Sequence, residues 1–147
     1  MAFSEVYTNG IQKQNRGHFA NIVKIAKADN KVTLEEQALL QKMAKSLNVN
    51  MVNYTRILEN PYKYPINPPG NSEDRITRLF GLAQMVLVDG DVAEEEIKLM
   101  QKIAIGLGFS SKNVEKVCQK AITLVAKKTI LERFIEEIKR INRSIDA

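Results

Sequence analysis

The sequence predicts an all-α protein of about seven helices, arranged as two pseudo-symmetric halves within a single domain that covers residues 1–147. Three observations predict this fold. Apolar residues recur at helical spacing along most of the chain. All four prolines fall between residues 60 and 71, so the remainder contains no proline to break a helix. A stretch of forty residues also recurs sixty positions later.

The repeat aligns residues 19–58 with residues 79–118 without a gap. Ten of the 40 aligned positions are identical, and nine of these lie from Asp29 to Leu47 in the first copy. The identical residues in the first copy are Asp29, Val32, Glu35, Glu36, Leu39, Gln41, Lys42, Ala44, Leu47 and Asn53. The chain is therefore predicted to be a tandem duplication of a helix–acidic loop–helix unit.

Each copy predicts an amphipathic helix, a short turn and a second helix. The apolar stripes fall at residues 22–26 and 39–47 in the first copy, and at 82–86 and 99–107 in the second. Asn30 and Gly90 occupy the turns, where a left-handed backbone ends a helix most easily. Two further helices are predicted within residues 112–143, and a short one near residues 4–9.

The segment that joins the copies, residues 60–71, is predicted to be a stiff and extended connector. It holds every proline of the chain, and proline also disfavours helix in the residue before it. Its tyrosines and Ile66 are expected to pack against the helices.

The duplicated acids are the candidate functional residues. Glu36 and Glu96 fall on the apolar stripe of the second helix of each copy, where an unpaired carboxylate is costly to bury. Each acid is expected to cap its own helix, to pair with a lysine, or to bind a divalent cation together with an aspartate seven residues earlier. Thr33 completes a capping box with Glu36, whereas Ala93 cannot do so with Glu96. The candidate ligands for Ca²⁺, Mn²⁺ or Mg²⁺ are Asp89, Asp91, Glu96, Asp29 and Glu36.

Other site chemistries fit the sequence poorly. An EF-hand would place Met85 and Leu87 at its first and third ligand positions, and neither side chain can bind calcium. The chain has one histidine, His18, and one cysteine, Cys118, which makes a zinc site improbable. His18 is expected near the start of a helix in a structural role, and Cys118 is expected to be a buried thiol. Phosphate-binding and nucleophile-elbow motifs are absent, so no enzymatic activity is predicted.

The net charge of +5 is concentrated near the C-terminus. Residues 112–143 hold nine Lys and Arg against four Glu, whereas residues 1–111 hold 13 against 12 acids. A solvated helix face explains this excess, and no specific nucleic-acid binding is predicted because no recognition motif accompanies it. Contact with a membrane surface through these basic helices is the alternative. No transmembrane segment or signal peptide is predicted, and a cytoplasmic location is expected.

The duplicated motif resembles the TerB-like tellurite-resistance family, which includes the N-terminal domain of the co-chaperone DjlA. The matching stretches are residues 28–36 and 88–96, and the resemblance extends over about residues 19–125. It implies an all-α fold of two halves and a link to tellurite resistance and the general stress response. It also implies metal binding by paired acids, which correspond here to Asp29, Glu36, Asp89 and Glu96.

These observations together predict a non-enzymatic binding or scaffold protein with an unknown protein partner and, as a cofactor, a divalent cation at the acidic loops. The main alternative is a plain helical interaction module whose acids serve only as caps and salt bridges. A metal-dependent hydrolase and a nucleic-acid binder are weaker alternatives.

Overall fold

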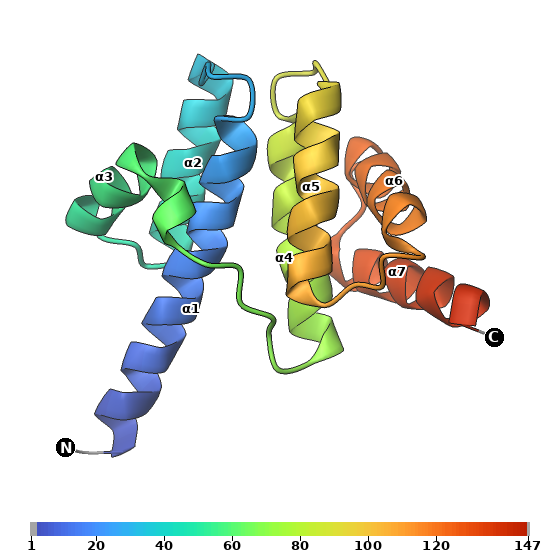
Figure 1. Cartoon of the computed structure of the whole chain (residues 1–147), viewed down its shortest axis with the longest axis horizontal. Coiled ribbons are helices and arrows are strands. Elements are labelled where there is room, and N and C mark those ends of the chain that lie inside the picture. Colours follow the sequence, from blue (N-terminus) through green and yellow to red (C-terminus); the bar gives the residue numbers. More distant parts are fainter. Residues whose placement is uncertain (1–2, 147) are drawn as a thin grey trace.

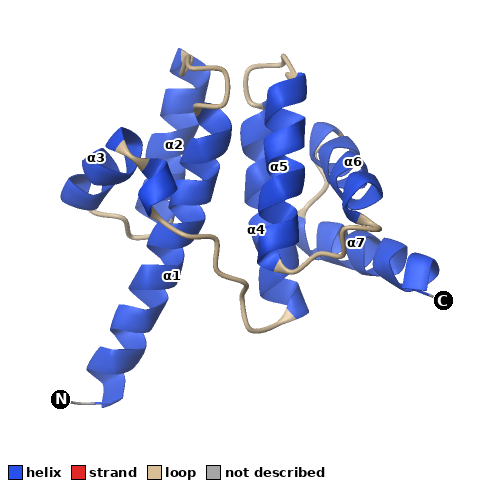
Figure 2. Ribbon diagram, in the orientation of Figure 1, coloured by secondary structure: helices blue, strands red, loops and turns tan. Residues whose placement is uncertain are grey.

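The computed structural model describes the backbone of residues 3–146 and the side chains of residues 10–142. Within that range the chain forms seven α-helices, one short 3₁₀ helix and no β-strand, which confirms the predicted all-α class (Figures 1 and 2). The helices are α1 Phe3–Ala26, α2 Leu34–Ser46, α3 Met51–Glu59, α4 Ser72–Leu87, α5 Glu94–Leu107, α6 Val114–Ala126 and α7 Leu131–Asp146, and the 3₁₀ helix is η1 Pro61–Lys63.

The first helix differs from the prediction. The separate short helix expected near residues 4–9 is wrong, because that segment belongs to α1, which continues through Gly10 and Gly17. A glycine inside a helix costs only about 1 kcal/mol, and burial of the second part of α1 outweighs that cost. His18 therefore lies inside a helix rather than near its start. The number of helices is still seven because residues 51–59 form α3.

The core is centred on α1 and α4, which pack against each other, with α5 packed against both. Their buried faces are aliphatic, as the low aromatic content predicts, and include Ile22, Ile25, Leu79, Leu82, Met85, Met100 and Ile103. The C-terminal helices α6 and α7 cover α4, and α2 and α3 each pack against α1 (Figure 1).

The two copies of the repeat share local structure. The turn residues Asn30 and Gly90 both have positive φ, at 65° and 82°. The carbonyl that ends α2, that of Leu47, accepts a hydrogen bond from Asn15 at 3.2 Å, and sixty residues later the carbonyl of Leu107 accepts one from Arg75 at 3.2 Å. This correspondence extends beyond the aligned segment. Superposition of the two halves as a pseudo-symmetric pair stays a prediction.

The proline-rich connector packs against both copies. The buried Lys24 ammonium of α1 donates to the Tyr64 carbonyl at 2.9 Å and to Asn21 at 3.0 Å. The Tyr62 ring lies 5.5 Å from the same ammonium. On the other side, Ile66 packs so closely on Gly106 of α5 that a Cβ added there would lie 2.7 Å from the Ile66 Cγ2 atom. The connector therefore packs against both halves along residues 62–66.

Candidate acidic site at the paired loops

The two acidic loops lie at the same end of the molecule, where α1 turns into α2 and α4 turns into α5 (Figure 1). Each loop is closed by its aspartate. The Asp29 carboxylate accepts the backbone N–H of Lys31 at 3.2 Å, and the Asp89 carboxylate accepts that of Asp91 at 3.1 Å. The identical aspartates thus fold both loops in the same way, which explains why the repeat retains them as part of its local structure.

Glu36 is buried at the start of α2, with 3% of its surface exposed. Its carboxylate accepts the Thr33 N–H at 2.9 Å, and the Thr33 hydroxyl accepts the Glu36 N–H at 3.0 Å, so the predicted capping box is confirmed. Burial raises the pKa of Glu36, as do the charges of Asp89 and Asp29, while both Thr33 hydrogen bonds oppose the rise.

Glu96 has the same position in α5 but a poorer environment. It is 4% exposed, and its Oε1 accepts the Ala93 N–H at a long 3.4 Å. Ala93 has no side-chain oxygen to return the bond, and the second carboxylate oxygen, Oε2, is buried without a hydrogen-bond partner. Burial raises the pKa of Glu96 to about 7, with further contributions from the charges of Glu36, Asp89 and Asp29. This carboxylate is therefore close to half-protonated at neutral pH.

Four of the five predicted ligands influence one another across the two halves. Asp29, Glu36 and Asp89 all raise the pKa of Glu96, which means that their charges lie close together. Asp91 is exposed and is not among the charges that raise either glutamate pKa. Among the described residues, no three His, Cys, Asp or Glu side chains are arranged to hold a metal ion as they stand. The neighbouring Glu35 and Glu95 are exposed, as their helical phase predicts.

The two other titratable residues singled out in the sequence are Cys118, which is buried, and His18, which is partly buried. Burial raises the pKa of the Cys118 thiol to about 12, so the thiol is protonated at neutral pH. Burial also lowers the pKa of His18 to about 4, and the nearby Arg78 charge adds to this effect. The His18 Nδ1 atom is buried without a hydrogen-bond partner. The Cys118 thiol lacks the exposure and the deprotonated state that a nucleophile needs, and the low pKa of His18 makes it a weak general base at neutral pH.

The basic C-terminal face has an internal organisation that the sequence did not reveal. Glu137 of α7 is approached by Lys120 at 4.0 Å, Arg133 at 3.7 Å and Arg140 at 3.4 Å. One partly buried carboxylate thus neutralises part of the positive charge. The spacing of Arg133, Glu137 and Arg140 on one helix face is the sequence signal for this cluster, whereas the approach of Lys120 from α6 needed the fold.

Comparison with known proteins yields no match: no protein-family model, no curated protein and no solved structure is significantly similar to this chain. None of the helices within residues 3–146 combines the length and the apolar character needed to cross a bilayer.

Proposed function

We propose that this chain is a non-enzymatic binding protein of TerB-like type whose paired acidic loops respond to a divalent cation. The supporting observation is the carboxylate of Glu96, which is buried among three other acids with one oxygen lacking any partner. A cation close to this oxygen would remove the like-charge repulsion and satisfy the buried atom at the same time. A cytoplasmic role in tellurite resistance or general stress response is the corresponding physiological proposal.

The residues that would hold the ion are Glu96 and Asp89, with Glu36 and Asp29 from the first loop. Their oxygens suit hard cations such as Ca²⁺, Mn²⁺ or Mg²⁺. Water molecules and a small approach of the two loops would have to complete the coordination shell, so modest affinity is expected. The second loop should dominate, because Glu36 is already engaged by Thr33 and Lys31 adds a positive charge to the first loop.

Calcium titration followed by amide NMR tests this proposal. The expected result is a set of saturable shifts within residues 88–96, with smaller ones within residues 29–36. Asp89→Asn should abolish them, and Asp29→Asn should change them little. Glu95→Gln is the matched control, because Glu95 belongs to the same helical turn but is exposed. Calorimetry in buffers of different ionisation enthalpy should also detect proton release near pH 7, because binding must displace the proton on Glu96.

The absence of shifts at millimolar calcium, manganese and magnesium would reject the cation proposal. The plain interaction module would then be the better function. That alternative has its own supporting observation, since the complete capping box already accounts for one oxygen of Glu36 in purely structural terms. For the basic C-terminal face we expect only weak, salt-dependent association with nucleic acid or anionic membranes, because Glu137 offsets part of its charge.

A further inference from the structure

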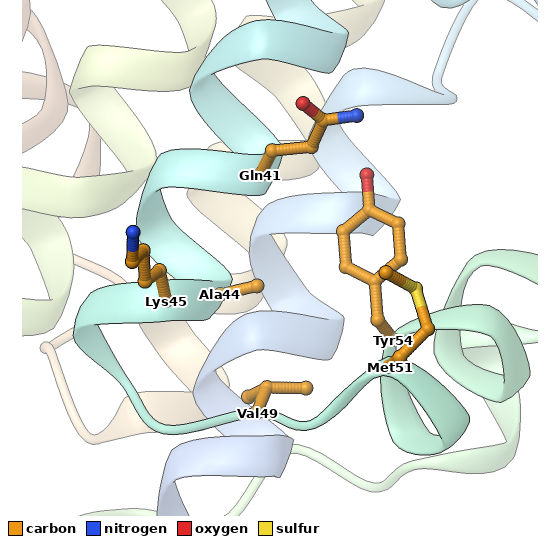
Figure 3. A pocket seen from close by; sticks show the side chains of 6 residues that line it. All are labelled: Gln41, Ala44, Lys45, Val49, Met51 and Tyr54. Atoms are coloured by element: carbon orange, nitrogen blue, oxygen red, sulfur yellow. The ribbon is translucent and has the colours of Figure 1, made fainter.

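A groove runs between α2 and α3 on the side of the first half (Figure 3). Its main hollow has a volume of about 450 Å³, and a second hollow of about 280 Å³ shares Tyr54 as a lining residue. The main hollow is lined by Gln41, Ala44, Lys45, Val49, Met51 and Tyr54, and the second by Lys27, Val32, Gln37, Leu40, Tyr54 and Leu58. We call the two together the α2–α3 groove.

The groove is open because α3 does not close onto α2. In the second half, α5 packs directly against α6. In the first half, α2 and α3 make few contacts with each other, and both pack against α1 instead. Tyr54 stands where the second copy has Val114, and its ring stacks on Phe19 of α1 with centroids 5.6 Å apart. A large ring in this position holds the two helices apart, while a valine lets the corresponding pair meet.

The lining of the groove is largely apolar and carries charge of one sign. Met51 is 75% exposed and the adjacent Val52 is 59% exposed, which is unusual for large apolar side chains placed side by side. Among the described residues that line the two hollows, the charged side chains are those of Lys27 and Lys45. Lys27 is engaged by the Leu58 carbonyl at 2.8 Å, whereas no acidic side chain among the described residues pairs with Lys45.

The Tyr54 hydroxyl is a polar atom inside the groove. It is buried and points toward the Gln41 side chain (Figure 3). Burial raises the pKa of Tyr54, and hydrogen bonding by Gln41 opposes this rise.

We propose that the α2–α3 groove binds an amphipathic helix of a partner protein, with apolar side chains against Met51 and Tyr54 and an acidic side chain facing Lys45. The shape supports a helix, because a trough between two helices receives a third along its length. The charge supports an acidic helix, because the Lys45 ammonium at the rim has no acidic partner among the described residues. Exposed methionine suits such a site because its flexible side chain adapts to the bound apolar face. This surface is separate from the acidic loops.

Two designed peptides test the proposal. Both are fluorescein-labelled amphipathic helices of about 18 residues, or five turns, with the same leucine stripe, and their polar positions are filled with Glu and Gln in one and Lys and Gln in the other. Anisotropy titrations are run in EDTA, so that the outcome is independent of any cation site. The acidic peptide should bind with micromolar Kd and the basic peptide about tenfold or more weakly. Amide shifts should map to the segment that lines the groove, residues 27–58.

Exposed substitutions keep the test independent of folding. Lys45→Glu should weaken the acidic peptide about tenfold, whereas Lys102→Glu, the same charge change on the exposed face of α5, should leave Kd unchanged. Met51→Ser should also weaken binding, with Ile105→Ser on α5 as its matched control. Unchanged thermal melts would show that all four variants fold.

Three results would overturn the proposal. The first is equal binding of both peptides, which would reduce the groove to a nonspecific apolar surface. The second is no binding at about 1 mM peptide, or shifts that map outside residues 27–58. The third is self-association of the chain in sedimentation, suppressed by Met51→Ser, which would assign the groove to a second copy.

Discussion

Glu36 and Glu96 occupy the same position in the two copies, yet only Glu36 is held by a complete capping box. The difference follows from one residue, since Thr33 supplies a hydroxyl that Ala93 lacks. Both side chains are nevertheless buried, and the charge of Glu36 raises the pKa of Glu96. Glu96 therefore lacks the hydrogen bond that Glu36 makes with the Thr33 side chain, and its carboxylate accepts the backbone N–H at a longer distance.

Glu96→Gln should stabilise the protein at pH 8 by about 2 kcal/mol, because each unit of pKa shift corresponds to about 1.4 kcal/mol and some is lost with the charge at the helix N-terminus. The pKa is raised from 4.5 to about 7, so the folded state holds a proton that the unfolded chain has released across this window. Stability due to Glu96 therefore falls as pH rises from 4.5 to about 7. Urea denaturation at pH 5 and pH 8 measures the effect.

The matched control is Glu36→Gln, which removes the same charge from a position with two Thr33 hydrogen bonds. At pH 8, Glu36→Gln should raise the free energy of unfolding by less than Glu96→Gln does. If Glu96→Gln instead destabilised the protein equally at both pH values, Glu96 would be an ordinary cap and its raised pKa would be wrong.

His18 should remain neutral in the folded protein down to about pH 5. Burial, with a further contribution from Arg78, lowers its pKa from 6.5 to about 4, so the unfolded chain takes up the proton first. Stability due to His18 is thus complete above pH 6.5 and is lost as pH falls toward 4. Because His18 is the only histidine, its imidazole signals in a ¹H–¹⁵N NMR titration need no assignment.

In urea the same signals should titrate near pH 6.5, which provides the reference. A folded-state midpoint close to that value would show that the ring is solvated. His18 and Glu96 change the free energy of unfolding in opposite directions between about pH 4.5 and 6.5, so their contributions to the wild-type stability should largely cancel there. In Glu96→Gln the rise in stability with pH that is due to His18 should become measurable.

Gly106→Ala should destabilise the protein by about 1–3 kcal/mol, the usual cost of overpacking, despite the better helix propensity of alanine. The added Cβ would lie 2.7 Å from Ile66 Cγ2 and 3.2 Å from Ile66 Cβ, so the connector must move. A double-mutant cycle with Ile66→Ala, measured by thermal unfolding, should recover most of the loss. Additive effects of the two substitutions would mean that the contact is loose.

Much of the fold could be predicted because the repeat and the apolar stripes reinforce each other. Glu36 and Glu96 were placed on the buried face by helical phase alone, and their burial is confirmed. The continuity of α1 could not be foreseen, because Gly17 favours a break locally and the packing of the helix against α4 outweighs this preference. Residues 51–59 were also not assigned a helix of their own, although they align with the start of α6.

The site was predictable as a set of acids but not as an arrangement. Nothing in the spacing says that the two loops lie at one end of the molecule, or that Asp91 is exposed and does not raise the pKa of either glutamate. The α2–α3 groove was equally hidden, because it arises from an orientation of α3 that differs from its counterpart α6. The differences at Lys45 and Tyr54, where the second copy has Ile105 and Val114, are the only sequence signals for it.

The connector affects how the two copies unfold and where the chain tolerates an insertion. Tandem copies joined by a flexible linker unfold one after the other. Here, however, the connector is hydrogen-bonded to Lys24 through Tyr64 and packs on Gly106 through Ile66. Unfolding should thus be cooperative across both copies. Lengthening the chain at the exposed Gly70 would cost little, since doubling a loop adds only about 0.6 kcal/mol of closure entropy. The same insertion beside Tyr64 would displace the carbonyl that Lys24 binds, while α1 and α4 would still join the two copies through the core.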